Sequence, residues 1–268
     1  MCRHGCETTE VTAKAEDGFL HAARELLERI ESTQRAALDD ASRICADAIA
    51  AGGLVHAFGT GHSRIPVEEL FPRYGSYPGF HPIVELSMSF HTQVVGANGQ
   101  RQAMFIERVE GLAAQILANF ELEPPDALLV FSAGGLTAVP IEMAMGARER
   151  GLPVIAVTSV ANARASQPTH TSGTRLLDHA DVVIDLCTPP GDALIELEGM
   201  DTPVAPGSTL AAVAIANEIK TLTAVALAAK GALPPVLTSA ALVGPERSAE
   251  LFDEAYAEHG RRVGRLLR

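Results

Sequence analysis

The chain has 268 residues, of which 47% are hydrophobic and 20% are charged, a globular composition that suffices for one sizeable α/β domain. Its net charge of -12 argues against a nucleic-acid partner, because binding a phosphate backbone requires a basic face. No apolar run reaches the ~20 residues of a membrane span, and the N-terminus carries no signal-peptide pattern. We therefore expect a cytoplasmic protein without a membrane partner.

Residues 1–17 have no periodic pattern and are expected to form a disordered tail. Within them, Cys2, His4 and Cys6 could chelate a metal, but no second pair of ligands follows nearby. Structural zinc sites usually have four closely spaced ligands. We therefore expect no metal at the N-terminus and no cofactor. The four cysteines, at positions 2, 6, 45 and 187, form no disulfide framework, which fits a reducing compartment.

The segment 18–51 carries apolar residues at helical spacing and ends at two glycines, which predicts one long helix or a helix pair. Short apolar runs of the length of buried strands follow it, at 54–58, 81–86, 127–131, 153–159 and 181–186. The run 81–86 is the least regular of them. A crossover helix is predicted over 137–151, between two of these strands, and such spacing indicates parallel pairing. The sequence thus predicts a doubly wound, five-stranded parallel sheet with helices on both faces.

Two further helices are predicted near the C-terminus. The nearly all-apolar segment 206–235 contains a core or interface helix, capped by Ser208 or Thr209 and ended by Gly231 and two prolines. An amphipathic helix follows over 244–268. Without repeats or linkers, we expect a single domain over residues 18–240 with a C-terminal helical extension at 241–268.

Two chemically similar loops follow two of the predicted strands. The first is GTGHS, from Gly59 through Thr60, Gly61 and His62 to Ser63, and the second is SAGGLT, from Ser132 to Thr137. Glycines let backbone N–H groups approach an anion, hydroxyls donate to it, and the following helix favours negative charge. The loops fit no P-loop, and Arg64 stands where a dinucleotide fingerprint needs its third glycine. We expect an anion site at the carboxyl ends of the strands.

The chain resembles the SIS (sugar isomerase) domain family, with a flavodoxin-like fold. The resemblance rests, in order, on LVHAFGTGHSRIPVEELFPRYGS, on DALLVFSAGGLTAVPIEMAMGARERGLPVIAVTS, on HADVVIDL and on PGSTLAAVAIANEI, and spans roughly residues 20–240. It is similar to small stand-alone phosphosugar-binding SIS proteins and, more distantly, to N-acetylmuramic acid 6-phosphate etherase and sedoheptulose 7-phosphate isomerase.

The resemblance implies which residues hold the phosphate and the sugar. The family motif S-x-S-G-x-T is matched by Ser132, Gly135 and Thr137, whereas Gly134 replaces the second serine and removes one hydroxyl. Ser63 corresponds to a phosphate- or sugar-contacting hydroxyl. The expected contacts are with Gly59, Thr60, Gly61, Ser63, Ser132, Ala133, Gly134, Gly135 and Thr137.

The resemblance also directs attention to the carboxylates behind the first loop. The etherase has a catalytic glutamate before a proline, an aromatic residue and a glycine, and Glu69 fits this pattern best, with Glu68 as its neighbour. A carboxylate base near C2 of a sugar is what proton abstraction requires. The alternative is a solvated helix face on which these glutamates pair with Arg64 or Arg73.

Several other polar residues are candidates for the site. His62 could assist ring opening, and His170 and Ser172 follow a predicted strand. His81 and His91 flank Glu85, but the absence of a zinc spacing argues against a metal there. Asn217 and Glu218 interrupt the apolar helix. They could bond across an interface, or Glu218 could enter a site as an acid or base.

We expect the chain to bind a phosphorylated sugar or amino sugar and to catalyse aldose–ketose isomerisation by proton abstraction at C2. The alternatives are an amino-sugar phosphate lyase or etherase and a non-catalytic sensor of a sugar phosphate. Two long apolar helices exceed what one sheet needs for cover, so a homodimer or homotetramer is expected.

Overall fold

The computed structural model describes residues 13–14, 17–91, 93 and 99–266. Five parallel strands form the main sheet in the order β3-β2-β4-β5-β6. Their bounds are β2 (Val55–Gly59), β3 (Phe80–Ile83), β4 (Ala127–Phe131), β5 (Val154–Thr158) and β6 (Val182–Asp185). Each lies within a residue or two of its predicted run, except that β3 ends three residues early, so the predicted doubly wound parallel sheet is confirmed.

The N-terminal segment forms a helix pair rather than one long helix. Its two members are α1 (Gly18–Thr33) and α2 (Arg35–Ala50). The break falls at Gln34, whose side-chain oxygen accepts the N–H of Asp185 at the edge of β6, 2.9 Å away. The hydroxyls of Ser32 and Thr33 bond back to carbonyls of their own helix, which is typical of bent or ending helices. The break therefore ties the helix pair to the sheet.

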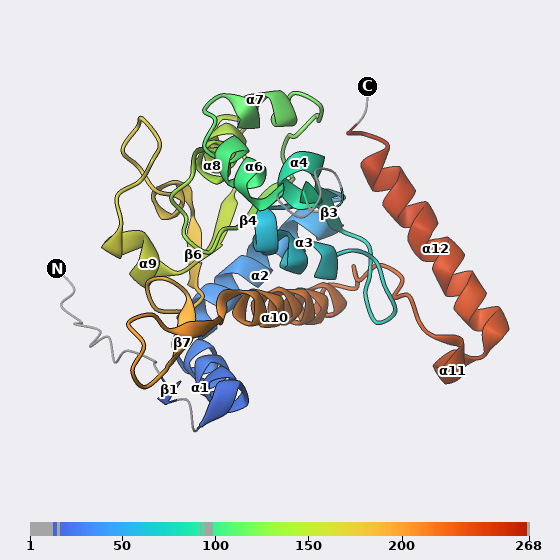
Figure 1. Cartoon of the computed structure of the whole chain (residues 1–268). Coiled ribbons are helices and arrows are strands. Elements are labelled where there is room, and N and C mark those ends of the chain that lie inside the picture. Colours follow the sequence, from blue (N-terminus) through green and yellow to red (C-terminus); the bar gives the residue numbers. More distant parts are fainter. Residues whose placement is uncertain (1–12, 15–16, 92, 94–98, 267–268) are drawn as a thin grey trace.

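Helices cover both faces of the sheet (Figure 1). On one face α1, α2, α3 (Arg64–Glu69) and α10 (Ser208–Ala229) contribute to one apolar core, and on the other α7 (Leu112–Leu117) and α8 (Ala138–Glu149) contribute to a second core. Side chains alternate between the two cores along β4, where Leu128 and Val130 belong to one and Leu129 and Phe131 to the other. Strands buried on both faces explain the continuous apolar runs in the sequence.

The remaining elements lie around these layers. They are η1 (Gly61–Ser63), α4 (Leu86–Ser89), α6 (Gly99–Ile106), α9 (Val160–Ala165), η3 (Leu176–His179), α11 (Ala240–Val243) and α12 (Pro245–Val263). The helix α12 confirms the predicted amphipathic C-terminal helix and runs along the outside of the molecule (Figure 1). Arg262, at its end, donates to the carbonyls of Ile49 and Gly53 and so caps the C-terminus of α2.

A second, three-stranded sheet was not predicted from the sequence. It has the order β1-β7-β8 and consists of β1 (Ala13–Lys14), β7 (Ala193–Glu196) and β8 (Val204–Pro206). The expectation of a disordered tail is therefore wrong for residues 13–14, which pair in parallel with β7. The rest of that tail, including Cys2, His4 and Cys6, lies outside the described residues apart from Asp17.

The helix α10 differs in detail from its prediction. It begins after Gly207, and neither Ser208 nor Thr209 is its N-cap. Instead, Asp192 accepts the N–H and the hydroxyl of Ser208 at 2.7 and 2.6 Å. By length and composition α10 could cross a membrane, although 44% of its most apolar window is buried in the protein. It lies alongside α2 (Figure 1), as expected for a core helix.

The polar residues of α10 also differ in burial and in hydrogen-bond partners from what the sequence predicts. Asn217 and Glu218 are not a buried pair, because Asn217 donates to the Val213 carbonyl of its own helix and Glu218 lies 3.8 Å from Arg35 with 44% of its side chain exposed. The buried charged residue of α10 is Lys220, whose Nζ donates to the Glu69 carbonyl at 2.9 Å. Burial lowers the pKa of Lys220.

Two histidines form a buried network at the opposite end of the sheet from the predicted site. In β2, His56 places Nε2 3.1 Å from Asp126 and Nδ1 3.0 Å from Nδ1 of His81. Burial, assisted by the neighbouring imidazoles of His56 and His259, lowers the pKa of His81 to about 4. His81 therefore stays neutral in the folded protein at pH values at which an unfolded chain would protonate it.

This network predicts an acid-sensitive fold. Below pH 6.5 the imidazole of His81 binds a proton in the unfolded state but stays unprotonated in the folded state. The free energy of unfolding therefore decreases progressively as the pH falls from 6.5 to about 4. At ~1.4 kcal/mol per pH unit the loss reaches roughly 3 kcal/mol. Urea unfolding at pH 7, 5.5 and 4.5 measures it. A His81→Gln variant should lose less stability than the wild type over this range, and equal losses would refute the assignment.

Candidate functional site

The two predicted loops meet at the switch point of the sheet. After β2 the chain moves to β3 on one side and then returns past β2 to β4 on the other. Ligands of open α/β sheets bind at such points, outside the carboxyl ends of the strands. The last paired residues of the two central strands are Gly59 and Phe131. The loops that begin at Thr60 and Ser132 therefore leave the sheet side by side.

The first loop makes a tight turn directly after β2. Gly59 lies so close to the Ser63 carbonyl that a Cβ at this position would be 2.2 Å from its oxygen, and Gly61 has a φ of +55°. Both glycines are therefore required by the turn. The N–H of Ser63 bonds to the Thr60 carbonyl, whereas those of Gly61 and His62 have no hydrogen-bond partner among the described residues. These two N–H groups remain available to a ligand.

The second loop is stabilised by its first serine. Ser132 accepts the N–H of Gly135 at 3.1 Å, and Gly135 has a φ of +62° with Thr158 packed against it. Within the described part of the chain, no partner binds the N–H groups of Gly134, Leu136 and Thr137. Thr137 is the N-cap of α8, yet its hydroxyl does not cap the helix. The loop thus presents N–H groups and hydroxyls at a helix N-terminus, where an anion is favoured.

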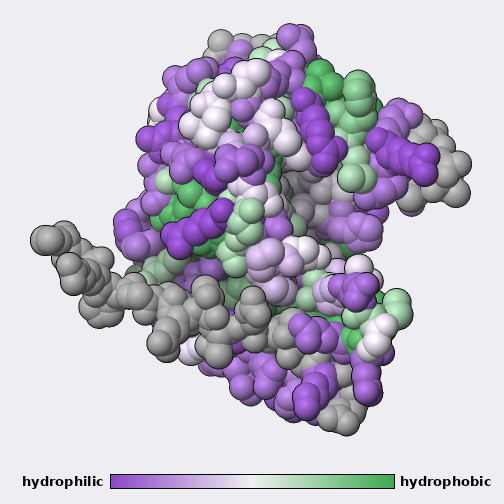
Figure 2. All heavy atoms as spheres, turned by 60° about the vertical axis from the view of Figure 1, so that its left-hand side comes forward, coloured by the Kyte–Doolittle hydropathy of each residue, from purple (hydrophilic) through white to green (hydrophobic). Residues whose placement is uncertain are grey.

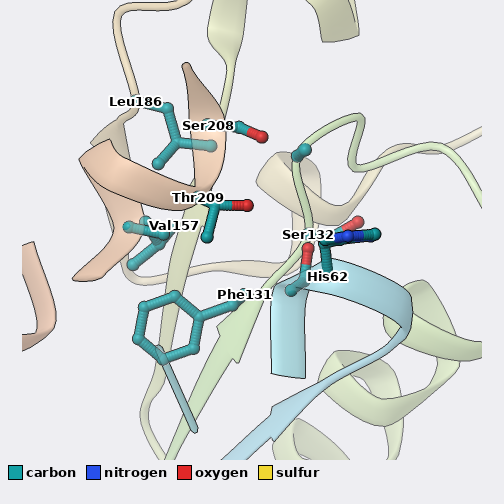
Figure 3. A pocket seen from close by; sticks show the side chains of 10 residues that line it. His62, Phe131, Ser132, Val157, Leu186, Ser208 and Thr209 are labelled. Atoms are coloured by element: carbon teal, nitrogen blue, oxygen red, sulfur yellow. The ribbon is translucent and has the colours of Figure 1, made fainter. Parts of the chain in front are cut away.

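A small cavity lies between the two loops and the N-terminus of α10. Figure 3 shows Ser132 and His62 on one side and Ser208 and Thr209, from α10, on the other. Its volume of about 10 Å³ is the room that one water molecule needs. A larger ligand would therefore lie across the mouth of this cavity. Of the residues expected in the site, His62, Ser63, Ser132 and Ala133 line it.

The α10 wall of this cavity was missed by the sequence analysis. From the sequence, Ser208 and Thr209 are expected only as helix caps, because nothing local in the sequence brings α10 to the carboxyl ends of β2 and β4. The bond between Ser208 and Asp192 fixes this N-terminus. The available signal was the pair of hydroxyls itself, at the start of a long helix.

A second residue that the sequence analysis missed is Glu107, just after α6. Its Oε2 accepts the hydroxyl of Thr60 at 2.9 Å, and its carbonyl accepts the N–H of Val139 in the first turn of α8. Glu107 therefore touches the elements that follow both β2 and β4. Burial raises the pKa of Glu107, although the Thr60 hydrogen bond opposes the shift. Thr60, expected to contact a ligand, uses its hydroxyl to hold this carboxylate.

The glutamates behind the first loop form ion pairs on α3. Arg73 donates to both carboxylate oxygens of Glu69 at 3.1 and 2.9 Å, and Arg64 donates to Glu68. The Glu69 side chain is 23% exposed and lines neither cavity, whereas Glu68 lines a second, small apolar cavity together with Gly59 and Arg64. These ion pairs match the alternative given above, in which Glu68 and Glu69 pair with Arg64 and Arg73 on a solvated helix face.

The loop after β5 carries His170 and Ser172 to a different place. His170 lies against Glu142 of α8 and Glu110, and its Nδ1 is 2.7 Å from the Ser172 hydroxyl. Neither residue lines the cavity between the two loops. The N–H and hydroxyl of Thr169 donate to the Leu136 carbonyl, so the loop nevertheless packs directly on the second loop of the candidate site.

The remaining histidine candidates do not converge. His81 bonds to His56, and Glu85 is the N-cap of α4, where it accepts the Met88 N–H. His91 is buried, and its Nδ1 has no hydrogen-bond partner among the described residues. In the part of the chain that the structure describes, one group of side chains has its possible metal-ligand atoms close together. It consists of Glu110, Glu142 and His170.

The five-stranded order and the loops at its switch point define an α/β protein of the flavodoxin-like kind. Residues 18–159 match the SIS domain family, and the chain belongs to this family. UPF0309 protein SCO4393 of Streptomyces coelicolor is 36% identical over 242 residues, which cover 90% of this chain and 94% of that protein. UPF0309 protein GK1441 of Geobacillus kaustophilus is 31% identical, with coverages of 90% and 93%.

The chain is also similar to solved structures at low sequence identity. The phosphoheptose isomerase GmhA of Neisseria gonorrhoeae has a TM-score of 0.50 and 13% identity, covering 76% of this chain and 94% of that one. The sugar isomerase domain of the RpiR transcription factor of Sphaerobacter thermophilus has a TM-score of 0.48 and 17% identity, with coverages of 91% and 99%. The family match over residues 18–159 and the 36% identity to SCO4393 confirm the sequence-based recognition of a SIS domain.

Proposed function

We propose that the chain binds a phosphorylated sugar at the two loops and isomerises it between aldose and ketose forms. The observation that carries the proposal is the convergence, at the switch point of the sheet, of hydroxyls and of N–H groups from both loops that have no partner among the described residues. Such a cradle suits the phosphate dianion, which backbone N–H groups and a helix N-terminus bind without nearby lysines or arginines. A local cradle also agrees with a net charge of -12.

In this proposal the second loop holds the phosphate. The N–H groups of Gly134, Leu136 and Thr137 and the hydroxyls of Ser132 and Thr137 donate to its oxygens. The backbone of Gly61 and His62 and the hydroxyl of Ser63 hold the sugar end, where the His62 imidazole assists ring opening. The absence of a hydroxyl at Gly134 removes one donor but leaves the backbone N–H in place.

Proton abstraction from C2 requires a carboxylate near the sugar. Two carboxylates are candidates for this role. Glu69 follows the first loop and resembles the glutamate of the etherase, while Glu107 is bonded to Thr60 at the start of that loop. Burial raises the pKa of Glu107, which brings a carboxylate closer to the pKa that a base needs at neutral pH. Hydroxyl and N–H donors would stabilise the enediolate.

A thermal-shift screen of hexose, heptose and amino-sugar phosphates, each paired with its unphosphorylated parent sugar, tests the proposed function. At millimolar concentration at least one sugar phosphate should raise the melting temperature, because a ligand that binds only the folded state stabilises it, whereas the parent sugar should not. Equal shifts by a sugar phosphate and its parent sugar would contradict phosphate-led binding, and no shift with any compound would reject the proposed ligand class.

We also propose that the chain forms a homodimer or a dimer of dimers. Apolar side chains remain exposed along α1 and α10, where Leu20 is 79% and Val225 is 63% exposed. Figure 2 shows apolar patches between polar ones on one face of the molecule. Light scattering at micromolar concentration should give at least twice the 28.2 kDa of one chain, and a single species of monomer mass would contradict this.

A further inference from the structure

We propose that Glu110, Glu142 and His170 bind a divalent transition-metal ion beside the second loop. One ligand atom of each residue lies within 4.8 Å of the other two. Nε2 of His170 is 3.3 Å from Oε1 of Glu142 and 3.9 Å from Oε2 of Glu110. Ligand atoms bound to one metal at ~2.0–2.2 Å lie ~3–4 Å apart in tetrahedral geometry. The three donors are therefore close to a ligating arrangement.

The charges of this cluster point to a cation. Two carboxylates face one imidazole, and within the described residues no lysine or arginine forms an ion pair with either carboxylate. The side chains of His170 and Glu142 are largely enclosed, at 8% and 16% exposed, whereas Glu110 lies at the surface. Two carboxylates held close together repel each other unless a cation or a proton is shared between them. A divalent ion would neutralise the pair.

Surrounding groups orient both carboxylates toward the imidazole. The N–H of Gly111 donates to both oxygens of Glu142, at 2.8 and 2.9 Å. The N–H and hydroxyl of Thr171 donate to the two oxygens of Glu110, at 2.7 and 2.6 Å. These donors hold the carboxylates without occupying all their lone pairs. Metal ligands in proteins are typically fixed by such neighbouring hydrogen bonds.

Ser172 can hydrogen-bond to either neutral tautomer of the His170 imidazole. The N–H of Ser172 lies 3.1 Å from Nδ1 of His170, and its hydroxyl lies 2.7 Å away. Without a cation, Nδ1 accepts this N–H and Nε2 donates its proton to Glu142. With a cation on Nε2, the ring proton moves to Nδ1 and is donated to the hydroxyl oxygen of Ser172, and the Ser172 N–H gives up its hydrogen bond to the ring. That hydroxyl has a further acceptor in Thr174, 2.6 Å away.

The donor set selects the kind of ion. One imidazole nitrogen and two carboxylate oxygens suit Zn²⁺ or Mn²⁺, whereas Ca²⁺ and Mg²⁺ prefer oxygen ligands alone. Three protein ligands leave at least one position open. The loop that carries His170 packs on the second loop, because Thr169 donates to the Leu136 carbonyl. A role of the ion toward a sugar rests on the proposed function, but its binding does not.

Isothermal titration with ZnCl₂ and with MnCl₂ tests the proposal on protein freed of metal by EDTA and then dialysed. Cys2 and Cys6 are replaced by serine in every sample, because these N-terminal thiols could bind Zn²⁺ independently. We expect one equivalent of at least one of the two ions to bind. Glu142→Gln and His170→Gln should each weaken that binding at least ~100-fold, since each removes one of three ligands.

Two further variants control this experiment. Glu149→Gln, an exposed glutamate near the end of the same helix α8, should bind the ion as the parent does. Glu110→Gln changes the most exposed ligand, so it should remain folded if Glu142→Gln does not. Binding of much less than one equivalent, or unchanged affinity in Glu110→Gln, overturns the proposal. Inorganic phosphate should still raise the melting temperature in EDTA, which separates a failure of the metal site from a failure of the phosphate site.

Discussion

Replacing one of two glutamates, Glu107 or Glu69, by glutamine should nearly abolish proton exchange at C2 of the bound sugar phosphate, whereas replacing the other should leave exchange in place. Glutamine keeps the shape of the side chain but cannot accept a proton, and removing a general base lowers turnover by ~10²–10⁴-fold while leaving affinity nearly unchanged. The measurement is the entry of solvent deuterium into C2 of the sugar phosphate that stabilises the protein most. It reports proton abstraction whether isomerisation or elimination follows.

The two variants discriminate between the candidates, because the base is the residue whose replacement stops exchange. A base acts only when it is deprotonated, and burial raises the pKa of Glu107. If Glu107 is the base, the rate of deuterium exchange should therefore begin to fall on acidification at a pH above the usual pKa of a glutamate. Glu68→Gln and Glu218→Gln are the controls and should retain exchange. Loss of exchange only in a control variant would move the role to that residue. No exchange in the wild type with any bound sugar phosphate would reject the isomerase and favour the sensor.

Replacing Ser132 and Thr137 together by alanine should weaken sugar-phosphate binding by ~10²–10⁴-fold. Each substitution removes a hydroxyl–phosphate hydrogen bond worth ~1.5–3 kcal/mol when charge-assisted, and each ~1.4 kcal/mol is a factor of ten in affinity. Isothermal titration of wild type and variant with the same sugar phosphate measures the difference. The same titration in EDTA should give an unchanged affinity, because the expected cradle consists of N–H groups and hydroxyls.

A matched control removes two hydroxyls elsewhere. Ser32→Ala/Thr33→Ala changes the same residue types at the end of α1, where both hydroxyls bond to their own helix, and should bind like the wild type. Wild-type affinity in the Ser132→Ala/Thr137→Ala variant would show that the phosphate lies elsewhere. Loss of binding in EDTA would show that a metal holds the phosphate.

The main sheet could be predicted from the sequence because its signals are local. Each central strand is a short run buried on both faces, and Gly59 and Gly135 mark turns that side chains would obstruct. Parallel strands also place their carboxyl ends at one edge, so the meeting of GTGHS with SAGGLT followed from topology alone. The SIS resemblance then supplied the chemistry of the two loops.

The rest of the site depends on contacts between residues far apart in the chain. Glu107 reaches Thr60, 47 positions away, and Ser208 and Thr209 enter the cavity only because Asp192 fixes the start of α10. The polar residues of α10 were misjudged for the same reason. Glu218 carries the stronger sequence signal, but Lys220 is the charged residue that is buried, with its Nζ bonded to the carbonyl of Glu69.

A crystal structure with the most strongly stabilising sugar phosphate would test phosphate-led binding at the two loops most directly. We predict the phosphorus atom at the N-terminus of α8, with phosphate oxygens within hydrogen-bond distance of the N–H groups of Gly134 and Thr137 and of the Ser132 hydroxyl. The sugar should then extend toward His62 and Ser63. A bound sugar phosphate whose phosphorus lies away from both loops would contradict the account.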